Sequence, residues 1–246
     1  MTPYHRLYAP KPKRLAVRAV TLVGLWVVTA GGALSAQVGY DPAHSPYRDI
    51  PRGGVAVVSA GYLSGSRGSV GVGLSDGATA GLRYEVQFGA VGASLGLGYG
   101  LTSRYVWVVD PLQAVPARKT GPFDNRVVLA DAGLQLVLTG RKTWHHFAPF
   151  VGAAIGLAAT SGAPRDTSGY DFGTKIMLAP NFGLRWYPAR SLSVRSDVRL
   201  VFWKLTYPAA YKVPNNVTGT SVLPSGAALS EWTSHPWATI GVGWIF

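Results

Sequence analysis

The sequence contains no cysteine, so disulfides, thiol catalysis and cysteine-ligated metal sites are excluded. Charged residues make up only 14% of the 246 residues, whereas soluble globular domains carry about 25%. Beyond the N-terminal region there is also no apolar run of the ~20 residues that a membrane-spanning helix needs. Hydrophobic residues nevertheless amount to 48%. They must therefore alternate with small or polar residues, as in strands with one apolar face.

Residues 1–36 have the three parts of a secretory signal peptide. Basic residues up to Arg18 precede an apolar core at residues 19–33, and small residues end at Ala36. We expect cleavage before Gln37; an uncleaved membrane anchor is the alternative. Cleavage would leave 18 basic and 11 acidic residues, which lowers the net charge from +12 to +7. Much of the positive charge then belongs to the signal peptide, so we expect no nucleic-acid partner.

Residues 37–54 contain three prolines and predict an irregular periplasmic N-terminal segment. A small plug and a partner-docking segment remain alternatives for it. Residues 55–246 alternate between apolar and small or polar residues in eight segments, which predict eight strands and no amphipathic helix. The segments are residues 55–63, 78–88, 91–105, 126–139, 147–159, 173–187, 192–204 and 237–246. Only the first has an ambiguous facing.

The connections between these strands alternate in length. Residues 89–90, 140–146 and 188–191 are short, whereas residues 64–77, 106–125, 160–172 and 205–236 are long. Outer-membrane barrels have short periplasmic turns and longer external loops. Because the strand count is even, both ends of the barrel would lie on the periplasmic side.

The last ten residues place a large apolar face on one side of the final strand: Ala238, Ile240, Val242, Trp244 and Phe246. This ending resembles the C-terminal signal of the bacterial outer-membrane β-barrel protein family, small eight-stranded type. The resemblance covers residues 55–246. It implies an all-β fold, a transmembrane antiparallel up-and-down β-barrel in the outer membrane. It also implies contact with outer-membrane lipid and lipopolysaccharide, and assembly by the outer-membrane insertion machinery, which would read Trp244 and Phe246.

The polar faces of the strands predict a network inside the barrel. Eight strands leave no open pore, because side chains fill so narrow a barrel. The residues expected to point inward are Arg83, Glu85, Gln87, Asp131, Gln135, Asn181, Arg185, Arg195, Asp197 and Arg199. A structural polar core is one interpretation. The other is an anion site, because the arginines outnumber the acids.

Aromatic residues predict two girdles at the membrane interfaces. Phe88, Phe147, Trp186, Trp244 and Phe246 lie near the short turns, and Tyr105, Phe202 and Trp237 lie near the long loops. Ordinary aromatic content of strands is the alternative.

The sequence offers little catalytic chemistry. His44, His145, His146 and His235 lack the spacing of metal ligands, so we expect no metal site and no cofactor. The one possible nucleophilic cluster is His235 with Ser230 or Ser234 and Glu231, and we expect no enzyme. A structural or surface-interaction role through the external loops is the first functional hypothesis. A narrow channel for a small anionic or apolar solute and a lipid-modifying enzyme are the alternatives.

Overall fold

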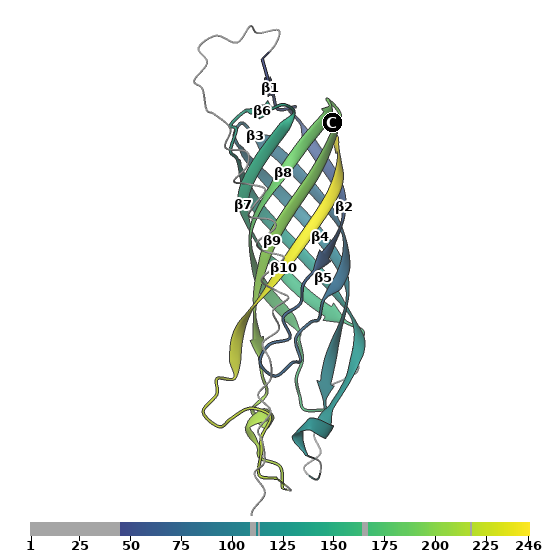
Figure 1. Cartoon of the computed structure of the whole chain (residues 1–246), viewed down its shortest axis with the longest axis vertical. Coiled ribbons are helices and arrows are strands. Elements are labelled where there is room, and N and C mark those ends of the chain that lie inside the picture. The colour runs from purple at the N-terminus through teal and green to yellow at the C-terminus, as the bar shows by residue number, and fades with distance from the viewer. Residues whose placement is uncertain (1–44, 109–111, 113, 164–166, 217) are drawn as a thin grey trace, which may run out of the picture. The chain divides into compact units, whose positions relative to one another are not determined.

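The computed structural model describes residues 45–246 apart from residues 109–111, 113, 164–166 and 217. The expected signal peptide and residues 37–44 lie outside the described residues. Eight long strands dominate the described part (Figure 1). They are β2 (Gly54–Leu63), β3 (Gly77–Phe88), β4 (Val91–Trp107), β5 (Lys119–Val137), β7 (Phe147–Ser161), β8 (Thr174–Ala189), β9 (Leu192–Thr206) and β10 (Ser230–Ile245).

These strands form a closed antiparallel up-and-down barrel, which confirms the fold class. Each strand pairs with the next long strand along the chain, and β10 pairs with β2. The closing register runs from Trp237 opposite Leu63 to Ile245 opposite Val55. Phe246 and Gly54 then exchange two backbone hydrogen bonds of 3.0 Å. The closure also settles the facing of β2, because Val57 is buried inside whereas Val58 is 64% exposed outside.

Two strands begin seven residues earlier than the alternation predicts. β5 starts at Lys119 instead of residue 126, and β10 starts at Ser230 instead of residue 237. Residues 119–125 pair only with β4, and residues 230–236 pair only with β9. Pro122 and Pro236 are tolerated there because these ribbons are sheet edges, where proline need not donate to a second strand.

A further small ribbon lies at the short-turn end. β1 (Tyr47–Asp49) pairs with β6 (Lys142–Trp144). The lead-in is therefore not wholly irregular, and the connection at residues 140–146 contains a strand; the sequence analysis was wrong on both points. Local alternation could not reveal three-residue strands that are about 95 residues apart.

The remaining regular elements are two short 3₁₀ helices in the long connections, η2 (Val115–Arg118) and η3 (Ala209–Lys212). Among the described residues, no helix is long and apolar enough to cross a membrane.

The outer face of the barrel carries a continuous apolar belt. On β5, Asp124 and Arg126 face outward at one end, and Val128, Leu134 and Leu136 follow on the same face. The outward face from residue 128 to 138 is therefore apolar, and tilted strands of about 9–11 residues span a bilayer. Exposed leucines, isoleucines and valines in this number are compatible only with lipid or another apolar surface around the barrel.

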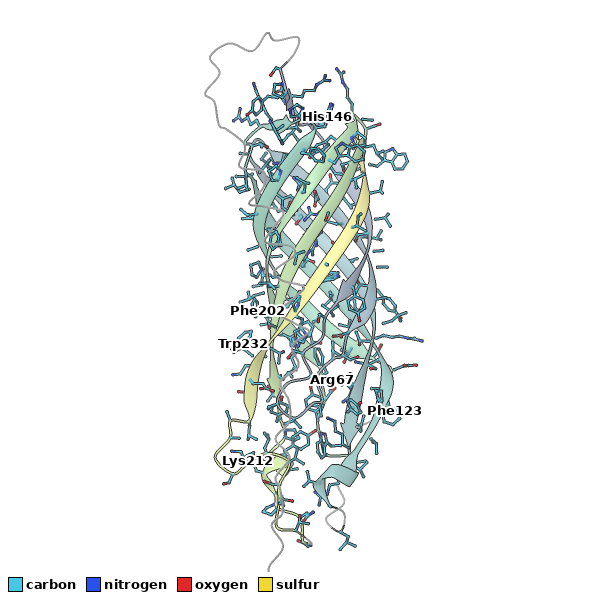
Figure 2. The ribbon with its side chains drawn as sticks, in the orientation of Figure 1. Arg67, Phe123, His146, Phe202, Lys212 and Trp232 are labelled. Atoms are coloured by element: carbon cyan, nitrogen blue, oxygen red, sulfur yellow. The ribbon has the colours of Figure 1, made fainter. Side chains whose placement is uncertain are left out.

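The aromatic residues of the short-turn end are placed as expected on this outer face. Phe88, Trp244 and Phe246 are all about two-thirds exposed (66%, 66% and 71%). Phe147 stacks on Trp186 with ring centroids 6.3 Å apart. At the other end, Phe202 faces outward beside the exposed Trp232 (Figure 2). Trp237 was assigned wrongly, because it is 3% exposed and points into the barrel.

We predict that Leu134→Arg destabilises the barrel by about 2–4 kcal/mol, because it puts a charge on the lipid face near the middle of the belt. Asp124→Arg is the control: it changes an exposed residue on the same face of the same strand, beyond the belt, and should cost at most about 1 kcal/mol. Reversible denaturant unfolding in lipid vesicles measures both. Equal costs would contradict the position of the belt.

Candidate functional site

The predicted polar network converges on one level inside the barrel. β3 contributes Arg83 and Glu85, and β5 contributes Asp131. β8 contributes Arg185, and β9 contributes Arg195, Asp197 and Arg199. Residues two apart on a strand share a face, so the chain needs only four strands to bring seven charges together. All seven are at most 9% exposed.

Each carboxylate in this cluster bridges two arginines. Asp131 lies 2.9 Å from Arg83 and 3.2 Å from Arg199. Asp197 lies 2.9 Å from Arg195 and 2.8 Å from Arg199. The three acids and four arginines thus form a connected network, which is what allows buried charges to persist.

Glu85 completes the network, with Arg185 at 2.9 Å from one carboxylate oxygen and Arg195 paired with the other. Gln135 accepts hydrogen bonds from both of these arginines. Gln87 accepts from Arg185 at 3.3 Å. Asn181 is also buried, but its amide donates to the carbonyl of Ala179. The structure therefore brings nine of the ten candidates into one bonded network and places the tenth on its edge.

Close approach at this level depends on a glycine. A Cβ atom at Gly96 would lie 2.5 Å from a guanidinium nitrogen of Arg83 and 2.8 Å from a carboxylate oxygen of Asp131. Aromatic rings that the sequence analysis did not include flank the arginines. The ring centroid of Phe150 lies 4.7 Å from the guanidinium carbon of Arg185 and 4.3 Å from that of Arg195. The ring centroid of Trp237 lies 4.9 Å from the guanidinium carbon of Arg199. Phe150 and Trp237 occupy inward-facing positions in the alternation of β7 and β10, and those positions were the sequence signal that could have included them.

A layer of apolar side chains, called the apolar floor, closes the barrel between this network and the short turns. Phe150, Val137, Ala148 and Ile245 come from the strands, and Ile50 comes from the N-terminal segment. All of them are buried. The described part of that segment therefore contributes a buried side chain to this floor.

The connection between β2 and β3 fills the opposite half of the barrel. Residues 64–76 were expected to form an external loop, but Val70, Val72 and Leu74 are at most 6% exposed and pack against inward residues of the strands. The expectation was wrong because the length and the glycine content of this connection are typical of an exposed loop. Apolar side chains every second residue, Val70, Val72 and Leu74, were the signal that could have revealed it.

Polar contacts from β10 hold this inserted loop. The ring nitrogen Nδ1 of His235 accepts a 3.0 Å hydrogen bond from the backbone of Ser66. The Glu231 carboxylate accepts from the backbone of Ser69, and the Tyr207 hydroxyl donates to the same carboxylate. Burial and, to a smaller extent, the hydrogen bond to Glu231 raise the pKa of Tyr207 above its ordinary value. The hydroxyl therefore remains protonated and able to donate.

The only nucleophilic cluster suggested by the sequence does not assemble. His235 is fully buried and stacks on Trp203 with centroids 3.9 Å apart, whereas Ser234 faces outward and is exposed. Glu231 accepts a hydrogen bond from Ser69 of the inserted loop rather than one from His235. His145 and His146 form a turn, and the described residues contain no group of three potential metal ligands.

Comparison with known proteins gives likeness of fold. No family profile matches the sequence, and neither does any curated protein. Among solved structures, Neisserial surface protein A (NspA) is 13% identical with a TM-score of 0.49, covering 82% of this chain and 98% of that one. The attachment invasion locus protein Ail of Yersinia pestis, with sucrose octasulfate, is 15% identical with a TM-score of 0.35, covering 79% and 99%. The outer membrane protein AlkL is 15% identical with a TM-score of 0.40, covering 85% and 97%.

The closed part of the barrel has no sheet edge, so the backbone groups of its strands pair internally, which is the condition for spanning a bilayer with strands. The apolar belt, the aromatic residues at its edge and the alternation of short turns with long loops complete the architecture of bacterial outer-membrane proteins. The chain is a small eight-stranded transmembrane β-barrel of the bacterial outer membrane.

We predict that Asp131→Asn lowers the free energy of unfolding by about 3–5 kcal/mol. The change removes the negative charge that Arg83 and Arg199 share, while both arginines stay buried. Asp124→Asn removes an exposed charge from the same strand and should change stability by no more than about 0.5 kcal/mol. Unfolding free energies in detergent or lipid give the comparison. A loss at Asp131 no larger than at Asp124 would mean that the ion pairs are dispensable.

Proposed function

We propose that this protein acts at the cell surface through its external loops, as a structural or interaction protein and neither a channel nor an enzyme. The observation that carries the proposal is the filled interior. Ile50 and Phe150 lie in the apolar floor at the short-turn end, the paired charges lie in the middle, and Val72 and Leu74 lie in the half nearest the long loops. With the described interior occupied at all three levels, the exposed loops are what remains for recognition.

The external end is built as a preformed surface. The ribbons β4–β5 and β9–β10 continue past the closed barrel, toward the lower end in Figure 1. In the connection between β9 and β10, Tyr211 and Leu223 are buried and joined by a 2.8 Å backbone hydrogen bond. Lys212 donates to the carbonyl of Ser225 at 2.9 Å. A loop that packs on itself in this way can present a fixed surface to a partner.

The channel alternative has less support from the interior. Selectivity by the arginines would need guanidinium groups that face a water-filled path. The four arginines of the network instead form ion pairs with Glu85, Asp131 or Asp197. An apolar solute would have to displace the inserted loop.

Planar-bilayer recordings of the purified protein test the choice between these functions. We expect no reproducible current with the wild-type chain, because the paired charges and the inserted loop leave no continuous water path. Glu231→Ala removes the acceptor that holds Ser69 and tests whether the loop alone blocks the barrel. A steady wild-type conductance would refute the proposal in favour of a channel. A changed lipid A profile on overexpression would refute it in favour of an enzyme.

We also propose lipopolysaccharide as a neighbour of the external edge of the belt. Lys204 faces outward opposite the 60%-exposed Trp232 in the β9–β10 register, and Arg126 ends the apolar face of β5. Cations just beyond an apolar belt are placed to meet lipid phosphates, and an aromatic ring suits the interface.

Replacing Lys204 and Arg126 by Glu should reduce the lipopolysaccharide retained by the purified barrel roughly tenfold, since each change reverses a charge. Arg141→Glu with Lys142→Glu is the matched control at the opposite end and should retain the wild-type amount. Bound lipopolysaccharide is quantified after size-exclusion chromatography. Equal retention by the two double variants would rule out this contact.

A further inference from the structure

The short-turn end of the barrel is strongly basic. Among the described residues its connections carry five basic side chains and one acidic one, Asp49. The basic residues are Arg48, Arg52, Arg141, Lys142 and Arg190. They come from the N-terminal segment, from the β5–β7 connection and from the β8–β9 turn. The fold thus gathers at one end charges that are up to 142 positions apart in the sequence.

Three of these arginines line one pocket. Arg48, Arg52 and Arg190 surround a volume of about 870 Å³ together with His146. Its inner wall includes Ile50 and Tyr187, which are buried members of the apolar floor. The pocket therefore ends at the floor and does not lead into the barrel.

The arginines of the pocket differ from those of the interior in having no acidic partner. Within the described part of the chain, no carboxylate lies within ion-pair distance of Arg48, Arg52 or Arg190. All three side chains are exposed. Asp49 also lines the pocket, but the three guanidinium groups outnumber it, so the hollow has a positive potential and favours an anion.

The pocket wall is held in place by backbone pairing. Arg48 lies opposite Thr143 in the β1–β6 ribbon, and the Thr143 hydroxyl donates to the Arg48 carbonyl at 3.2 Å. The backbone of Ile50 donates to the Arg141 carbonyl at 3.0 Å. This short segment thus has a fixed backbone although it has only three residues in a strand.

The turn that presents His146 has an unfavourable local conformation. His145 and His146 connect Trp144 to its partner Phe147, with φ angles of 49° and 68°. A two-residue hairpin turn with positive φ at both positions favours Asn-Gly, because most side chains destabilise this conformation. Histidine tolerates positive φ better than most residues, so the turn permits the two histidines without favouring them over Asn-Gly. His146 lines the pocket from this turn, so its ring is available to a ligand there.

The pocket also adjoins the membrane interface. Trp144, on the same ribbon, is 51% exposed, and the stacked pair Phe147 and Trp186 lies on the outer face beside it. Tryptophan prefers the level of the lipid headgroups. A headgroup of the adjacent leaflet is therefore within reach of the pocket.

We propose that this pocket binds the phosphate headgroup of an acidic phospholipid in the periplasmic leaflet of the outer membrane. Arg48, Arg52 and Arg190 would bind the phosphate oxygens, for which the planar guanidinium has matching geometry. His146 would add a ring nitrogen as a further donor. The acyl chains would lie along the apolar outer face next to Trp144 and Trp186.

Native mass spectrometry of the full chain tests the proposal after reconstitution in mixed phosphatidylethanolamine and phosphatidylglycerol and return to detergent. The pocket variant carries Arg48→Gln, Arg52→Gln and Arg190→Gln. The control carries Arg67→Gln, Lys119→Gln and Lys175→Gln, which removes the same charge from the other end. We expect phosphatidylglycerol adducts on the wild type and the control, and roughly tenfold fewer on the pocket variant. Heat-modifiable gel migration verifies that each variant is folded.

A second variant separates binding from turn geometry. Replacing His145 by Asn and His146 by Gly should leave the barrel at least as stable, because the turn conformation then suits its residues. The same variant should retain several-fold less phosphatidylglycerol, because the pocket loses the His146 donor.

Five results would overturn the proposal. Equal adduct loss in the pocket and control variants would show that net charge alone matters. Equal retention of phosphatidylethanolamine would show that no acidic headgroup is selected. Displacement of the adduct by millimolar inorganic phosphate would identify free phosphate as the occupant, and displacement by soluble peptidoglycan fragments would identify the cell-wall polymer. Unchanged adducts on both pocket variants would remove the site altogether.

Discussion

Closure of the sheet between β10 and β2 is the constraint on which the rest of this structure depends. Lipid offers no water to strand edges, so each N–H and C=O within the membrane needs a partner on a neighbouring strand. The register from Trp237 opposite Leu63 to Ile245 opposite Val55 provides those partners. Closure with only eight strands also makes the barrel narrow. Inward side chains from opposite walls must therefore meet, whatever their chemistry.

That narrowness explains the interior. Arginines from β3, β8 and β9 could not remain buried without counter-charges, and Glu85, Asp131 and Asp197 each bridge two of them. Where the strands supply small or apolar inward residues instead, residues 64–76 enter and add Val70, Val72 and Leu74. The interior is thus filled by two means, ion pairs in one half and an inserted loop in the other. Both are structural contributions, which leaves interaction with other molecules to the two ends.

The two ends are organised differently. At the long-loop end, ribbons extend past the closed barrel and the connection between β9 and β10 packs around Tyr211 and Leu223. At the short-turn end, a three-residue ribbon and tight turns place arginines around a pocket on the outer side of the apolar floor. A surface role at one end and a lipid contact at the other are compatible, because the filled interior separates the two sites.

The sequence by itself determined the number of barrel strands, the facing of most of them and the inward position of the charged residues. Alternation with a period of two is a local property, and a closed barrel preserves it along every strand. It could not determine the one-sided extensions at Lys119 and Ser230, the β1–β6 ribbon or the inward path of residues 64–76. Nor did it predict that His235, beside a proline, would hold the inserted loop, or that Arg48 and Arg190 would share a pocket. Only the tertiary structure decided these features, because each depends on contacts between segments far apart in the chain.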